Sequence, residues 1–313
     1  DDVSVLVIPK VIVGKKGDKS WITWIGSDPQ PILNSERADL PKTSVTWQVS
    51  ESSDQAWKSG VKTAVDRIHN NGLDKVVLAR DVVGTSENAI DARSILKTLA
   101  VEYPSTWNFS VAGLVGATPE LLLRLTKSMV TSRVLAGTIS KTGDDERDLA
   151  LAASLARSSK DLEEHEFAVT SVATSLALHC TDMKVPSTPR VLRLSNVAHL
   201  ATDISGTLVD SAPALVLAGS LHPTAAICGT PTGRAKSLIK ELEQMDRHRY
   251  TGPVGWINAK GDGELGIALR CAEIIENKAR LFAGCGIVSE STPIDELAES
   301  DAKFAAMKDA LTN

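Results

Sequence analysis

Two pairs of acidic residues have the spacing of a metal site. Asp161 and Glu164 lie three positions apart inside residues 144–179, a stretch with neither glycine nor proline. Glu296 and Glu299 repeat that spacing near the C-terminus, and residues three apart on a helix share one face. Converging carboxylates repel one another unless a cation lies among them, and Mg²⁺ prefers such oxygen ligands. The spacing therefore suits a magnesium site, while a solvated helix face explains either pair taken alone.

A lysine and a glutamate each precede an apolar run. Lys75 is followed by Val-Val-Leu-Ala, and Glu120 is followed by Leu-Leu-Leu. In a partly desolvated site, burial lowers the pKa of a lysine and raises the pKa of a glutamate. The neutral amine is then a base and the protonated carboxyl an acid, the combination that an elimination or addition needs. The alternative is that both charges mark the exposed ends of strands.

Four further residues suit the binding of an anion. Gly284 and Gly286 lie in Ala-Gly-Cys-Gly-Ile-Val, where glycine lets the backbone approach a ligand or present N–H groups to it. Arg270, at the end of a predicted strand over 264–271, and Lys303 both suit carboxylates. A β-bulge and ordinary surface ion pairs explain these residues equally well.

The pattern around these residues predicts an α+β layered fold. Gly261 and its neighbours indicate a hairpin turn between two apolar strands, and other strands are grouped between helical stretches. The regular alternation of a doubly wound sheet is missing, as are a phosphate-binding loop and a dinucleotide fingerprint in the right context. The expected elements are a strand over 3–13, strands at 75–80, 107–115, 120–125, 254–258, 264–271 and 279–288, and helices at 53–70, 91–101, 144–179 and after residue 293.

Composition excludes several classes of protein. The 313 residues are 42% hydrophobic, carry a net charge of −5 and include only 4% aromatic residues, so no nucleic-acid partner is expected. The apolar stretches are too short to span a bilayer, so no membrane partner is expected either. We interpret the first residues as following a missing leader. The cysteines form no C-x-x-C pair and are interpreted as reduced thiols of a cytoplasmic protein: Cys180, Cys228, Cys271 and Cys285.

Taken in order along the chain, ten short motifs resemble those of the chorismate-binding enzymes. They are Asp74-Lys75-Val-Val-Leu-Ala-Arg80, Thr118-Pro119-Glu120-Leu-Leu, Leu135-Ala-Gly137-Thr138, Lys160-Asp161-x-x-Glu164-His165, His199-Leu-Ala-Thr202, Leu221-His222-Pro223-Thr224, Gly252-x-x-Gly255-Trp256, Leu269-Arg270-Cys-Ala, Ala283-Gly284-x-Gly286-Ile-Val and Glu296-x-x-Glu299. The resemblance covers residues 73–311, whereas residues 1–72 match weakly. We therefore treat residues 1–313 as a single chorismate-binding domain whose core is 73–311.

The resemblance implies a fold and a ligand set. The fold is a layered α/β/β/α arrangement like that of anthranilate synthase component I, with two facing antiparallel sheets covered by helices. The small-molecule substrate is chorismate and the cofactor is Mg²⁺. By motif, Glu164 and Glu299 would contact the ion, while Asp161 and Glu296 would hold its waters. The remaining residues implied to bind the substrate are Arg270, Lys303, Gly284 and Gly286 at its carboxylates, and Gly137, Thr138 and His199 at its ring.

Lys75 narrows the choice of subfamily. Members that make anthranilate have glutamine at this position, whereas isochorismate synthases, salicylate synthases and aminodeoxychorismate synthases share lysine. In isochorismate synthases the lysine is thought to deprotonate a water that attacks C2, and the residue equivalent to Glu120 protonates the departing C4 hydroxyl. The segment from His199 to Thr202 also resembles that group, with small Ala201 near the ring.

The resemblance favours an isochorismate synthase that acts as a monomer. One alternative is a salicylate synthase, which eliminates pyruvate after making isochorismate. Another is a catalytically silent chorismate-binding subunit, against which the presence of both Lys75 and Glu120 argues. Whether the product serves siderophore, salicylate or menaquinone synthesis stays open.

Overall fold

The structure, a computed structural model, describes residues 4–26, 40, 44–49 and 54–312. The chain divides into two compact units, residues 1–41 and 42–313. The first contains an antiparallel hairpin of β1 (Val11–Lys16) and β2 (Lys19–Trp24). The strand predicted over 3–13 is therefore wrong for most of its length, because pairing with β2 begins at Val11. The prediction of a single domain stays a prediction.

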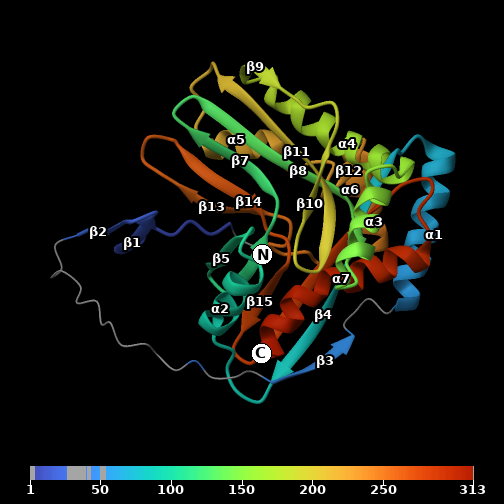
Figure 1. Cartoon of the computed structure of the whole chain (residues 1–313), viewed down its shortest axis with the longest axis horizontal. Helices are drawn as coiled ribbons and strands as arrows, with labels where there is room; N and C mark the ends of the chain where they lie inside the picture. Colours follow the sequence, from blue (N-terminus) through green and yellow to red (C-terminus); the bar gives the residue numbers. More distant parts are fainter. Residues whose placement is uncertain (1–3, 27–39, 41–43, 50–53, 313) are drawn as a thin grey trace. The chain divides into compact units, whose positions relative to one another are not determined.

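Two antiparallel sheets make up most of the second unit (Figure 1). The described strands of the first sheet are β7 (Leu121–Thr126), β8 (Met129–Ser140), β9 (Cys180–Lys184), β10 (Arg190–Arg193), β11 (Val197–Leu208), β13 (Pro253–Ile257) and β14 (Gly263–Ile267). Their order is β10-β11-β8-β7-β14-β13, and β9 also pairs with β11. The glycine-containing turn between β13 and β14 confirms the predicted hairpin.

The second sheet contains Lys75 in β4 and both Gly284 and Gly286 in β16. Its described strands are β3 (Val45–Val49), β4 (Lys75–Ser86), β5 (Trp107–Val111), β6 (Leu114–Thr118), β12 (Gly229–Thr230), β15 (Cys271–Ile275) and β16 (Lys278–Ile287). Their order is β12-β4-β16-β15-β6-β5. Strand β3 pairs with the C-terminal part of β4, from Val82 to Ser86. Long β4 and β16 pair residue by residue, so Lys75 at the start of β4 lies next to the end of β16.

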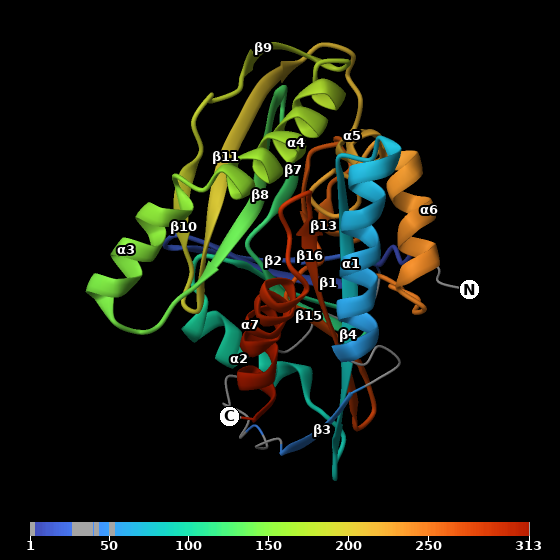
Figure 2. The ribbon, with the colours of Figure 1, turned by 90° about the vertical axis from the view of Figure 1, so that its right-hand side faces the viewer.

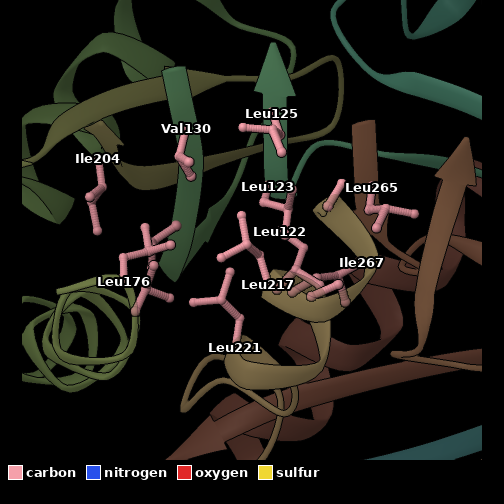
Figure 3. Packing of buried hydrophobic residues seen from close by; sticks show 14 of the residues in the cluster. Leu122, Leu123, Leu125, Val130, Leu176, Ile204, Leu217, Leu221, Leu265 and Ile267 are labelled. Atoms are coloured by element: carbon pink, nitrogen blue, oxygen red, sulfur yellow. The ribbon is translucent and has the colours of Figure 1, made fainter. Parts of the chain in front are cut away.

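Helices α4 (Ser159–Leu176) and α5 (Ala214–Leu221) cover one face of the first sheet. Leu176 and Leu217 from these helices pack against Leu123, Ile204 and Ile267 of the strands (Figure 3). Burial of such large aliphatic side chains stabilises the fold by roughly 1.5–3 kcal/mol each. This contact fixes α4, which carries two of the predicted metal ligands, against the sheet.

The second sheet is covered by two pairs of helices. Helices α1 (Asp54–Asn71) and α6 (Thr232–Leu242) lie side by side over β4 and β16 (Figure 2). Helices α2 (Ala92–Glu102) and α7 (Pro293–Thr312) pack further along the same sheet, where Leu99 and Phe304 meet Leu281. The α+β fold with two antiparallel sheets is thereby confirmed. No helix in the described ranges has the length and apolarity to cross a membrane.

The single helix predicted over 144–179 is wrong, because the chain forms α3 (Asp145–Leu155) and then α4. Ser158 between them has extended backbone angles, and its hydroxyl accepts a hydrogen bond from Asp161 N at 3.2 Å. Serine is a favoured N-cap because it satisfies such an otherwise unpaired amide. The break places Asp161 and Glu164 in the first two turns of α4.

Candidate active site

A pocket with an empty volume of about 530 Å³, its open mouth included, is lined by residues of both sheets and of α4 and α7. Most of the predicted site residues line it, although they come from distant parts of the sequence. They are Glu120, Gly137, Thr138, Glu164, His199, Arg270, Gly284, Gly286 and Lys303. The structure therefore brings the predicted acid, one predicted metal ligand and the predicted carboxylate anchors to one place.

Lys75 lies just behind the wall of this pocket. It is fully buried, and its ammonium is 3.1 Å from Glu164 Oε1 and 3.4 Å from the Glu164 carbonyl oxygen. A side chain at Gly286 would collide with Glu164 Oε1 and lie 2.9 Å from Lys75 Cε. Glycine at this position is thus needed for the two charged groups to meet. Lys75 is an internal charge, not the exposed end of a strand.

Glu164 is ionised in this environment. Burial alone would raise the pKa of its carboxyl, but the ammonium groups of Lys75 and Lys303 hold the pKa below its usual range. Its second oxygen, Oε2, accepts a hydrogen bond from Gly137 N at 3.2 Å. Both oxygens are therefore held in place by the protein.

Gly137 presents its N–H to Glu164 because β8 carries a β-bulge here. The register between β8 and β11 shifts between His199 and Leu200, which leaves Gly137 as an extra residue. Its φ of +74° is a conformation that glycine adopts without the strain of a side chain. The bulge explains why glycine stands at this point of the motif, and the next residue, Thr138, lies with its hydroxyl 3.1 Å from His199 Nδ1.

Glu120 has the properties of an acid. It lies between β6 and β7, is 4% exposed, and burial raises the pKa of its carboxyl to about 8. The positive charges of Lys75, Arg270 and Lys303 oppose that shift without cancelling it. At neutral pH the side chain therefore carries a proton that it can donate.

The raised pKa makes a prediction about stability. Above its ordinary pKa of 4.5 an unfolded Glu120 is ionised, whereas the folded chain keeps it protonated up to about pH 8. This group should therefore lower the free energy of unfolding by about 1.4 kcal/mol per pH unit between those values. Glu120→Gln removes the effect, so the variant should gain stability over the wild type as pH rises from 4.5 to 8. Urea unfolding across this range measures the difference, and a pH-independent difference would contradict the assignment.

His199 and Arg270 form a buried pair. Arg270 Nη2 donates to His199 Nε2 at 3.1 Å, which places the ring proton on Nδ1, 3.3 Å from the Gly137 carbonyl oxygen. Burial and the charge of Arg270 lower the pKa of His199, so its ring is neutral. Arg270 itself lies in the link between β14 and β15 with a φ of +48°, so its predicted place at a strand end is wrong. The link turns the guanidinium towards the pocket, where it can meet an anion.

Lys303 is anchored at the other side of the pocket. Its ammonium donates to the Gly284 carbonyl oxygen at 2.8 Å and forms an ion pair with Glu299. A side chain at Gly284 would lie 2.9 Å from the Leu78 carbonyl oxygen, so a larger residue would push β16 away from β4. Lys303 thus presents a fixed positive charge beside the glycine backbone.

The acidic residues of α7 meet those of α4 around Lys160. The Lys160 ammonium lies 2.6 Å from Glu296 Oε1. Burial would lower the pKa of Lys160, but the charges of Glu296, Glu299 and Glu164 outweigh it and raise the pKa. The pairing of Lys160 with Glu296 was not predicted from the sequence, although Lys160 directly precedes Asp161 in the sequence.

These carboxylates fit a bound Mg²⁺. Glu296 is buried, its Oε2 has no hydrogen-bond partner, and burial together with the charge of Glu299 raises its pKa. Half-buried Asp161 borders the Gly137 bulge. Crowded carboxylates with an unsatisfied oxygen are the donor set that a hard divalent cation prefers. Glu164, Glu296, Glu299 and Asp161 would hold the ion.

Some lining residues were missed by sequence reasoning. Tyr250, Thr251, Ala226 and Ile227 line the pocket, and the ring of Tyr250 stacks on Phe282 at 5.1 Å between centroids. These residues lie within a few positions of the motifs that end at Thr224 and begin at Gly252. Their closeness in sequence to these motifs was the one signal that could have identified them. Conversely, Ala201 does not line the pocket.

Comparison with known proteins decides the family. The family model described as "Chorismate binding enzyme" matches residues 4–312. The chain belongs to the chorismate-binding enzyme family. Within this family, isochorismate synthase DhbC of Bacillus subtilis is 39% identical over 267 residues, which cover 82% of this chain and 67% of that protein.

Two solved structures of chorismate-binding enzymes share the fold. MenF, the menaquinone-specific isochorismate synthase from Escherichia coli, matches with a TM-score of 0.79 and 29% identity, covering 88% of this chain and 65% of that one. Anthranilate synthase component I from Streptococcus pneumoniae matches with a TM-score of 0.73 and 27% identity, covering 87% and 61%. The chain thus spans about two thirds of the length of these family members. Since synthases of different products share the fold, the fold does not choose the product.

Proposed function

We propose that the protein converts chorismate to isochorismate with Mg²⁺ as cofactor. The observation that carries the proposal is a buried, protonated glutamate that lines the pocket, Glu120, together with a buried lysine, Lys75, that contacts the pocket residue Glu164. The similarity to isochorismate synthases, 39% identity in one case, supports the same product.

The pocket provides positive charge and N–H groups for the carboxylates of the substrate. Arg270 and Lys303 line it together with the backbone at Gly284 and Gly286. The neutral ring of His199 is held by Arg270 on one side and by the Gly137 carbonyl on the other, so it keeps a fixed orientation beside the substrate ring. These groups orient the ring between the base and the acid, which lowers the entropic part of the barrier.

The proposed reaction needs one base and one acid. Lys75 acts in its neutral amine form, after loss of the ammonium proton: it takes a proton from the water whose oxygen bonds to C2, and the ring double bonds shift. Glu120 donates its proton to the C4 hydroxyl, which leaves as water, so the overall composition of the substrate does not change. Bound Mg²⁺ would supply Lewis-acid stabilisation of a substrate carboxylate. The buried position of both side chains excludes bulk water that would otherwise compete as a proton donor.

A product assay tests this proposal. The purified chain is incubated with chorismate and Mg²⁺, and isochorismate, salicylate, anthranilate and pyruvate are resolved by chromatography. We expect isochorismate without pyruvate. Accumulation of pyruvate with salicylate would instead support a salicylate synthase, and a complete lack of turnover would support a silent chorismate-binding subunit.

Ala201 should influence the product. Ala201 lies two residues after His199 on β11, so both side chains point to the same face of the sheet. It pairs with Leu135 of β8, which lines the pocket. Ala201 is 1% exposed, so a larger side chain must displace its neighbours. Overpacking typically costs about 1–3 kcal/mol of stability, so we expect the strands around Ala201 and Leu135 to shift and to change the shape of the pocket.

We therefore expect Ala201→Thr to release pyruvate at the expense of isochorismate, whereas the wild type releases none. Ala201→Ser, which adds only a hydroxyl, is the matched control and should cause a smaller shift. The same chromatographic assay measures both ratios. An unchanged ratio at unchanged turnover would show that Ala201 does not act on the ring.

A further inference from the structure

A largely buried ion pair contacts two segments that line the active-site pocket. Glu243 follows the last residue of α6, and Arg247 lies four residues further along the chain. The Arg247 guanidinium donates to both carboxylate oxygens of Glu243, with 2.8 Å between Nε and Oε2. The side chain of Glu243 is 3% exposed and that of Arg247 is 16% exposed. Neither residue has a part in the proposed reaction, so their role needs a separate explanation.

The pair lies at an open edge of β4. On this edge β12 pairs with the start of β4 and β3 pairs with it from residue 82 onward, while β16 occupies the other edge. Between β12 and β3, no described strand pairs with β4 on this edge. Instead, Arg247 Nη2 donates to the Val77 carbonyl oxygen at 2.8 Å, and the Ala79 amide donates to Glu243 Oε1 at 2.7 Å. These two backbone groups follow one another along the edge, so the two side chains take the places of a neighbouring strand's hydrogen-bonding groups.

The same guanidinium also holds the segment after α5. Arg247 Nη1 donates to the Ile227 carbonyl oxygen at 2.9 Å. Both Val77 and Ile227 line the pocket. Lys75 lies two residues before Val77 in β4, so its side chain points to the same face of the sheet. One arginine thus joins the strand that carries Lys75 to a second part of the pocket wall.

We propose that Arg247 is a positioning residue that, together with Glu243, fixes Lys75 and Ile227 at the pocket. The inference rests on the proposed function, in which Lys75 is the base. A guanidinium holds its N–H groups in one rigid plane and can bond a carboxylate and two carbonyl oxygens at once, whereas a lysine ammonium cannot reproduce these directions. The rate of the chemical step depends steeply on the position of the reacting groups, and a displacement of about 1 Å can cost about 100-fold.

Arg247→Met tests this role at a temperature at which the variant is fully folded. We expect kcat for isochorismate formation to fall by about 10-fold to 100-fold, because the base is no longer held in place. KM for chorismate should change little, since the carboxylate anchors Arg270 and Lys303 lie outside β4. A merely structural role would instead lower the temperature of unfolding and leave kcat of the folded enzyme unchanged.

Arg249→Met is the matched control. Arg249 also donates to two carbonyl oxygens, those of Val111 and Ala112, and lies 3.8 Å from the carboxylate of Glu273. Its contacts are at the turn between β5 and β6, and these residues do not line the pocket. We therefore expect Arg249→Met to lose stability but to keep the wild-type kcat.

Hydrogen exchange separates this inference from the proposed function, because it does not depend on turnover. The Ala79 amide should exchange faster in Arg247→Met than in the wild type or in Arg249→Met, since Glu243 is then no longer held against β4. Unchanged exchange at Ala79, or an unchanged kcat, would refute the positioning role.

If Arg247→Met does not fold, Arg247→Lys decides. This variant keeps a positive charge beside Glu243 but not the bonds to both carbonyl oxygens, so kcat should still fall, and a wild-type kcat would refute the role. A wild-type chain that makes no isochorismate would refute the proposed function, and exchange at Ala79 would then decide alone whether the pair fixes β4.

Discussion

Lys75→Ala should abolish isochorismate formation, with a loss in turnover of about 10² to 10⁴. The reason is the removal of the base that activates the attacking water. The rate is measured as isochorismate released from chorismate at saturating Mg²⁺. A variant that retains nearly the wild-type rate would refute the mechanism, although the family assignment would stand.

The ion pair with Glu164 requires a second variant. Because Lys75 lies 3.1 Å from Glu164, alanine removes both the base and the partner of a buried carboxylate. Lys75→Gln keeps a hydrogen-bond donor near Glu164 but no base, so it should lose turnover while binding chorismate better than Lys75→Ala does. Glu120→Gln should lose turnover likewise, and its combination with Lys75→Ala should not be additive, because both residues act on one step.

The second large effect concerns the metal. Activity should disappear with a chelator and return with Mg²⁺, and Glu164→Gln should raise the Mg²⁺ concentration needed by at least about 10-fold to 100-fold. Glu164 is buried and lines the pocket, whereas neighbouring Glu163 is exposed and lies about 100° around the helix. Glu163→Gln is therefore the matched control and should change the Mg²⁺ requirement little. Equal effects of the two substitutions would contradict the proposed ligand face.

The local sequence pattern was sufficient to predict several of the strands and helices that carry the site residues. Apolar runs next to a charged residue predicted the start of β4 at Lys75, and the glycine-containing turn predicted the β13–β14 hairpin. The helix predicted after residue 293 is α7, which carries Glu296 and Glu299 on one face. In these cases the signal depends on neighbouring residues, so it can be read without knowledge of the tertiary structure.

The remaining features depend on contacts between distant residues. The break at Ser158 arises from one side-chain hydrogen bond, and the bulge at Gly137 depends on the register with β11. The approach of Lys160 to Glu296 joins two helices that are 136 residues apart along the chain. Spacing could suggest that Asp161 and Glu164 share a face, but not which cations surround them.

The lysines around the carboxylates have a consequence for assembly. Lys75, Lys160 and Lys303 each contact one of the acidic residues Glu164, Glu296 and Glu299, and so serve as internal counterions. In many small metal-binding domains the ion is required for folding, because the ligands have no other partner. Here the negative charge is largely balanced before any ion arrives. We therefore expect folding and metal loading to be separable events, so that the chain folds without Mg²⁺.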